Sequence, residues 1–252
     1  MPAKRAFRPL LLTATLAAAV AAAAAGITAS GATASTPAPP RLNAPGLHAR
    51  AAAQSAAAPA ADAACGYHAA IPADNFKGIP AFNAAQAARP FLVRFITTQG
   101  VITVRMLTAK APCTTFSFRF LASRGYFNQT HCHRLTTQGI YVLQCGDPTG
   151  TGSGGPGYAF NDENLAGATY PAGTVAMANA GPDTNGSQFF FTWKDTTLSP
   201  AYTPFGTVVG GLNVLQKIAA AGDDQQNGPG DGYPSRFTQF LYVQVIPAGN
   251  GG

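Results

Sequence analysis

The segment "AMANAGPDTNGSQFFF", residues 176–191, joins two β-rich runs through a turn of Gly, Pro, Asn and Asp residues. Apolar and aromatic runs that are separated by these turn residues are typical of antiparallel strand pairs. Alternate residues of a strand share one face, so Gln188 and Phe190 point to the same side of the sheet. The segment therefore predicts a strand pair in which one face carries both hydrogen-bonding and apolar groups.

A second strand pair with the same mixture lies in "HCHRLTTQGIYVLQCGDPTG", residues 131–150. Arg134 stands in its first run, and Gln144 closes the second run on the same face as Val142. Isolated long polar side chains beside apolar ones suit an apolar ligand that also carries backbone carbonyls. A proline within an extended peptide is a ligand of this kind.

Strand patterns dominate the rest of the chain. A hairpin is predicted over residues 91–106, and single strands over 203–209 and 237–246. Helical spacing appears only over 114–125 and 211–221, while the glycine-rich segments 146–158 and 223–234 are expected to be loops. Because strands and helices do not alternate, we predict a mainly β fold, an antiparallel barrel with a helix at each end.

The first 34 residues have the three parts of a secretory signal peptide. A basic start is followed by the apolar run Leu10–Gly26 and by a small-residue cleavage site at Ala32–Ala34. An uncleaved anchor is the alternative, but the run is Ala-rich and weakly hydrophobic for a membrane span. Residues 35–64, dominated by Ala and Pro, predict a disordered linker. We therefore expect an exported protein, with no stable membrane insertion after cleavage and one folded domain over 65–252.

Charge and motifs exclude several classes of function. The formal net charge is +6, but three of the 16 basic residues lie in the predicted signal, which leaves 13 basic against 10 acidic residues. No basic cluster with interleaved aromatics is present, so no nucleic-acid partner is expected. His131 and His133 flank Cys132, yet successive residues of a strand face opposite sides, so Cys132 points away from both histidines and no metal site is expected. The chain has no phosphate loop and no nucleophile motif, and we expect no cofactor.

Taken together, the motifs resemble the cyclophilin family of peptidyl-prolyl cis/trans isomerases. The resemblance extends over residues 91–246. It is carried by "CHRL", "YVLQCGDPTGTGSGGPGYAFNDEN", "GTVAMANAGPDTNGSQFFFT" and "YTPFGTVVGGLNVL". It implies a closed antiparallel eight-stranded β-barrel capped by two α-helices. The implied activity is isomerisation of X-Pro bonds in proline-containing polypeptides, by a monomer and without a covalent step. A proline-peptide binding module or chaperone with little turnover is the alternative.

The resemblance also assigns roles to residues of this chain. Arg134 is implied as the catalytic donor to the prolyl amide, and Gln144 as the residue that holds or assists it. The residues implied to bind substrate are Tyr141, Val142, Ala178, Asn179, Gln188, Phe190, Leu198 and Tyr202. Nine residues separate Arg134 from Gln144, where the family usually has a shorter connection. We expect the extra residues to lengthen the turn at 137–139 without moving the strands.

The four cysteines, an even number in a predicted exported chain, favour disulfides, and three pairings are possible. Cys132 begins the strand that bears Arg134, and Cys145 ends its antiparallel partner, so these two are expected to lie opposite one another. Cys65 is then expected to pair with Cys113, which ties down the start of the domain.

Overall fold

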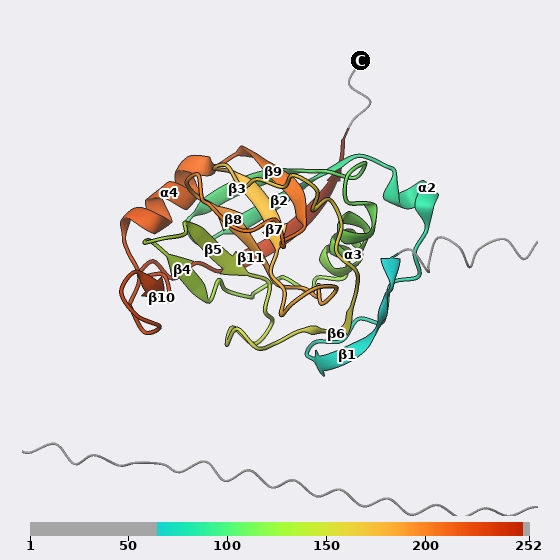
Figure 1. Ribbon diagram of the computed structural model, residues 1–252, viewed down its shortest axis with the longest axis horizontal. Coiled ribbons are helices and arrows are strands. Elements are labelled where there is room, and N and C mark those ends of the chain that lie inside the picture. Colours follow the sequence, from blue (N-terminus) through green and yellow to red (C-terminus); the bar gives the residue numbers. More distant parts are fainter. Residues whose placement is uncertain (1–64, 249–252) are drawn as a thin grey trace, which may run out of the picture. The chain divides into compact units, whose positions relative to one another are not determined.

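The computed structural model describes residues 65–248, so the predicted signal peptide (1–34) and linker (35–64) lie outside the described residues. The described part is built around one antiparallel sheet that curls on itself (Figure 1). Its strands are β2 (Phe91–Thr97), β3 (Gly100–Met106), β4 (Arg134–Thr136), β5 (Val142–Cys145), β7 (Thr174–Met177), β8 (Phe189–Thr192), β9 (Pro204–Gly210), β10 (Asp231–Gly232) and β11 (Phe240–Pro247). Their order is β10-β4-β5-β8-β7-β9-β3-β2-β11. The mainly β fold and each predicted strand pair are confirmed.

The sheet is nine-stranded and open, which corrects the predicted closed, eight-stranded barrel. Its end strands, β10 and β11, do not pair with each other. Because β10 occupies the free edge of β4, β11 cannot form a ladder with that strand. Two backbone hydrogen bonds instead link the start of β11 to the segment that precedes β4. Phe240 N–H donates to Thr130 O (2.8 Å), and Cys132 N–H donates to Thr238 O (2.9 Å).

Two longer helices cover the ends of the curled sheet, as predicted (Figure 1). One is α3 (Pro112–Ser123), which begins with a proline whose fixed φ suits the first helical turn. The other is α4 (Leu212–Ala220), which buries Leu215 and Ile218. A short helix, α2 (Ala84–Ala87), packs beside α3. Within residues 65–248, no helix is long and apolar enough to cross a membrane.

Aromatic rings fill the interior between the sheet and α3. Phe189 on β8 lies at the centre, with ring centroids 5.3 Å from Phe118 of α3 and 5.8 Å from Phe95 of β2. Phe240 of β11 stacks on it at 6.2 Å. All four side chains are almost fully buried. This packed interior means that any binding site of the sheet has to lie on its outer face.

Two segments predicted as loops contain short strands, which corrects those predictions. In the first, β6 (Pro156–Ala159) pairs with β1 (His68–Ala73), a strand that the sequence patterns did not indicate. In the second, β10 pairs with β4. Pro and Gly disfavour strands in general, but both segments meet a partner strand that is distant in sequence, and pairing with that partner overrides the local preference.

Both predicted disulfides are present. Cys65 is bonded to Cys113 with a Cα–Cα distance of 5.4 Å, and Cys132 to Cys145 with a distance of 4.0 Å. The first bridge attaches the chain just before β1 to the start of α3. The second joins the segment before β4 to the end of β5, so it lies next to the strands that carry Arg134 and Gln144.

Candidate active site

One row of side chains crosses four neighbouring strands. Arg134 on β4 is paired with Gln144 on β5, and Gln144 is paired with Phe190 on β8. The row ends at Ala176 on β7, which is paired with Phe190. Directly opposed residues of antiparallel strands point to the same face of a sheet. Strand register alone therefore brings the predicted Arg, Gln and Phe together.

This row lies on the outer face of the sheet. The residues that alternate with it along the same strands, such as Leu143, Phe189 and Phe191, are fully buried in the main core. The connection from β4 to β5 occupies residues 137–141 and leaves Arg134 opposite Gln144. The long connection therefore fits into the turn, where Gly139 has a positive φ of 71°.

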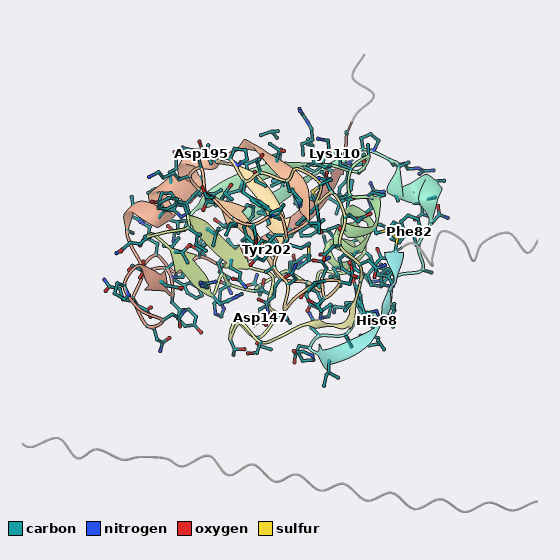
Figure 2. All side chains as sticks on the ribbon, viewed as in Figure 1. His68, Phe82, Lys110, Asp147, Asp195 and Tyr202 are labelled. Atoms are coloured by element: carbon teal, nitrogen blue, oxygen red, sulfur yellow. A yellow bond between two sulfur atoms is a disulfide. The ribbon has the colours of Figure 1, made fainter. Side chains whose placement is uncertain are left out.

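A small apolar cluster covers the middle of the row. It is separate from the main core, and its buried members are Val142, Tyr170, Ala176 and Phe190. Leu198, Ala178 and Tyr202 pack against them and are partly exposed. The Tyr202 ring lies edge-on to Phe190 at 5.7 Å, near the centre of the view in Figure 2. The outer face thus carries a second apolar cluster, whose partly exposed edge includes Leu198, Ala178 and Tyr202.

The structure places Tyr141 apart from this cluster. Its ring lies 5.1 Å from that of Trp193, and the Lys194 ammonium lies 4.4 Å from the ring centroid. Tyr170, by contrast, belongs to the cluster although the sequence patterns did not indicate it. Its hydroxyl donates to Tyr202 O (2.8 Å) and accepts from Tyr202 N–H (3.1 Å). Tyr170 lies outside the regular strands, so no residue periodicity in the sequence indicated it. Ala176, the other cluster member that the sequence analysis did not name, could have been found, because it lies two residues before Ala178 and shares its strand face.

Two glutamine amides form a chain of hydrogen bonds beside the cluster. Gln144 Nε2 donates to Gln188 Oε1 (2.9 Å). Gln188 Nε2 in turn donates to Gly152 O (2.9 Å) and Gly154 O (3.0 Å). The glycine-rich loop therefore orients Gln188, and Gln188 orients Gln144. Gln144 is thus hydrogen-bonded to Gln188 and not to Arg134, and its assisting role in catalysis stays a prediction.

Arg134 is held instead by Asp231, a residue that the sequence analysis did not single out. Arg134 Nε donates to Asp231 Oδ1 (2.8 Å) and Nη2 donates to Oδ2 (2.6 Å). The hydrogen bond to Asp231 raises the pKa of Arg134, against the effect of burial. The same contact lowers the pKa of Asp231. Both groups are therefore charged, and the guanidinium stands at the end of the row with 37% of its side chain exposed.

A pocket of about 540 Å³ adjoins the two glutamines. Its walls come from β1, from the glycine-rich loop and from residues 178–180. The Asn179 side chain donates to Ala201 O (2.8 Å) and accepts from Gly181 N–H (3.3 Å), which holds this segment in place. Neither backbone group of Asn179 has a backbone partner within residues 65–248. An extended peptide can therefore form hydrogen bonds along this edge.

The two histidines that flank Cys132 have no common ligand site. Within the described part of the chain, no group of three or more His, Cys, Asp or Glu side chains is arranged to hold a metal ion. The ring of His131 lies against Phe237 at 5.5 Å. His133 is 6% exposed, directly before Arg134. Its burial lowers its pKa from 6.5 to about 4, against the opposing charge of Asp147.

This buried imidazole predicts a loss of stability in acid. Between pH 6.5 and 4 the unfolded chain binds a proton at His133 that the folded chain does not, so the free energy of unfolding falls as the pH falls. The full effect is on the order of 3 kcal/mol, since one pKa unit corresponds to about 1.4 kcal/mol. Urea denaturation at pH 7.5, 6, 5 and 4.5 measures it. We expect His133→Gln to flatten the pH profile and His131→Gln to leave it steep. Equal slopes in the wild type and His133→Gln would contradict this assignment.

Comparison with known proteins agrees with this geometry. Residues 92–233 match the family model described as cyclophilin type peptidyl-prolyl cis-trans isomerase. The chain is 46% identical over 168 residues to the probable peptidyl-prolyl cis-trans isomerase B of Mycobacterium tuberculosis, which covers 61% of this chain and 53% of that protein. It therefore spans about half the length of that relative. It is 37% identical to the peptidyl-prolyl cis-trans isomerase-like 1 of Emericella nidulans, over 63% of this chain and 96% of that protein.

Solved structures show the same fold. A cyclophilin type peptidyl-prolyl cis-trans isomerase of Cryptosporidium parvum superposes with a TM-score of 0.55 at 30% identity, over 62% of this chain and 97% of that one. A crystal structure of the same protein in the presence of the dipeptide Ala-Pro superposes equally well, at 31% identity. The match of the family model to more than half of the chain, together with these relatives, shows that the chain belongs to the cyclophilin-type peptidyl-prolyl cis-trans isomerase family.

Proposed function

We propose that this protein catalyses the cis/trans isomerisation of X-Pro peptide bonds in exported polypeptides. The observation that carries the proposal is the row on the outer face of the sheet. It joins a charged guanidinium, that of Arg134, to a buried apolar cluster around Phe190 through strands in direct register. In the proposed pose the proline ring lies on this cluster and its amide nitrogen faces Arg134, since only Gln144 stands between Phe190 and Arg134 in the row.

The barrier to this reaction is the loss of amide resonance. Rotation about the peptide bond costs about 18–20 kcal/mol, and an uncatalysed X-Pro bond takes tens to hundreds of seconds to isomerise. No bond is made or broken, so the protein only has to bind the twisted amide more tightly than either planar form. In the twisted state the nitrogen regains a lone pair and accepts a hydrogen bond that the planar amide cannot accept.

Arg134 is the donor in this mechanism. Its guanidinium is charged, and Asp231 leaves Nη1 without a hydrogen bond within the described residues. The neighbouring apolar cluster excludes water, which strengthens the interaction with the amide nitrogen. Each factor of ten in rate requires about 1.4 kcal/mol of preferential binding to the twisted state. One charge-assisted hydrogen bond formed mainly in that state supplies a large part of the acceleration.

The remaining residues of the site hold the substrate. Val142, Phe190, Leu198 and Tyr202 surround the proline ring. The backbone groups of Asn179 bind the residue before proline. Gln188 and Gln144 line the adjoining pocket. Two disulfides support export, because such bridges persist in oxidising compartments.

An exchange experiment tests the proposal. Two-dimensional NMR exchange on a short Ala-Pro peptide, with purified residues 65–252 at catalytic concentration, measures the rate of cis/trans interconversion directly. We expect cross-peaks between the isomers to appear at mixing times far shorter than the uncatalysed lifetime. Peptide binding without faster exchange would identify the alternative, a proline-binding module with little turnover.

A further inference from the structure

The contact between Arg134 and Asp231 determines how the guanidinium is oriented. The pair is bidentate, with Nε and Nη2 donating to the two carboxylate oxygens. A forked pair of this kind fixes the plane of the guanidinium as well as its position. Asp231 is the only hydrogen-bonded side-chain partner of Arg134 within residues 65–248, since the Gln144 amide is bonded to Gln188. Orientation of Arg134 therefore depends on Asp231.

Asp231 is itself held firmly. Its backbone lies in β10, where it is paired with Thr136 of β4. Its Oδ1 also accepts from Asn227 Nδ2 (3.2 Å), and Asn227 N–H donates to Asp231 O (3.0 Å). The base of the loop is attached to the β4–β5 turn, because Thr137 N–H donates to Gly230 O (2.8 Å). The carboxylate is thus presented by a strand and a closed turn.

We propose that Asp231 is a positioning residue for prolyl isomerisation, which holds the Arg134 guanidinium so that Nη1 is the donor left for the prolyl nitrogen. This inference rests on the proposed function, since it concerns the same Arg134. The carboxylate does not touch the substrate. It restricts a long, half-exposed side chain to the orientation that the twisted amide requires, which lowers the cost of forming that hydrogen bond in the transition state.

The expected signature is a loss of kcat with little change in KM. Asp231→Ala removes the fork, and we expect kcat/KM to fall about tenfold, because the donor has to be oriented anew in each turnover. Asp231→Asn keeps one acceptor for Arg134 and should lose less. Binding of the planar ground state does not require the oriented donor, so KM should stay within about twofold. NMR exchange at several peptide concentrations separates the two parameters.

Asp224→Asn is the matched control, because it removes one negative charge from the same loop without contact to Arg134. Asp224 Oδ1 accepts from the backbone N–H groups of Gln226 and Tyr233, and asparagine keeps that acceptor. We expect wild-type kcat and KM. The positioning role further predicts that Asp231→Ala has no additional effect in an Arg134→Ala background, where no guanidinium remains to orient.

The outcomes distinguish this inference from the proposed function. A large loss for Arg134→Ala together with wild-type or raised kcat for folded Asp231→Ala would overturn the positioning role and leave the proposed function standing. An equal loss for Asp231→Ala with and without Arg134 would show a structural role only and would also overturn it. A folded Arg134→Ala with wild-type turnover would instead reject the mechanism of the proposed function.

Discussion

Replacing Arg134 by alanine is expected to lower kcat/KM by roughly 10²–10³-fold while the fold remains intact. This is the range observed when one preorganised hydrogen-bond donor to a developing charge is removed. The side chain is half-exposed and lies on the outer face of the sheet, so its removal leaves no cavity in the core. Because the guanidinium acts on the twisted amide, the loss should appear in kcat more than in KM. NMR exchange on an X-Pro peptide measures both.

Arg94→Ala is the matched control for this experiment. Arg94 is an exposed arginine on β2, on the part of the sheet formed by β2, β3 and β11. Its removal changes the net charge by the same amount, so any general effect of charge on peptide binding appears in both variants. We expect Arg94→Ala to keep wild-type turnover. If the Arg134→Ala variant also keeps wild-type turnover, and circular dichroism shows that it is folded, then another group stabilises the twisted amide.

Removal of the Cys65–Cys113 disulfide is expected to cost about 4 kcal/mol of unfolding free energy, the larger of the two disulfide effects. The bridge closes a loop with a sequence separation of 48, against 13 for Cys132–Cys145. In the chain-entropy model the longer loop gives the larger stabilisation, and the shorter bridge is assigned about 3 kcal/mol. Urea denaturation of the double serine variants at pH 7.5 measures both losses.

The two bridges serve as controls for one another, since each double variant removes the same number of sulfur atoms. The long bridge also attaches β1, and β1 forms one wall of the 540 Å³ pocket. We therefore expect Cys65→Ser/Cys113→Ser to weaken peptide binding in addition to stability. A smaller stability loss than that of Cys132→Ser/Cys145→Ser would contradict the entropic ranking.

The sequence by itself determined the strand pairs and the grouping of several candidate site residues on common strand faces, because both depend on local patterns. Alternation along residues 176–191 and 131–150 places Gln188 with Phe190 and Gln144 with Val142 on common faces, and a hairpin brings Arg134 opposite Gln144. The same pairing predicts that Cys132 lies beside Cys145, as the structure shows. The helices followed from their spacing, with boundaries that differ from α3 and α4 by only a few residues.

Tertiary structure alone decided how the sheet ends and which group holds Arg134. Asp231 lies 97 residues beyond Arg134, in a glycine-rich segment whose composition indicates only a loop. Similarly, β1 pairs with β6 across more than 80 residues, and Tyr170 enters the apolar cluster from an irregular segment. Such contacts depend on the path of loops through positive-φ glycines such as Gly230, and on which strand edge is left free. Residue periodicity predicts which face of a strand or helix a side chain occupies, but it does not predict the path of a loop. These contacts are therefore decided only by the tertiary structure.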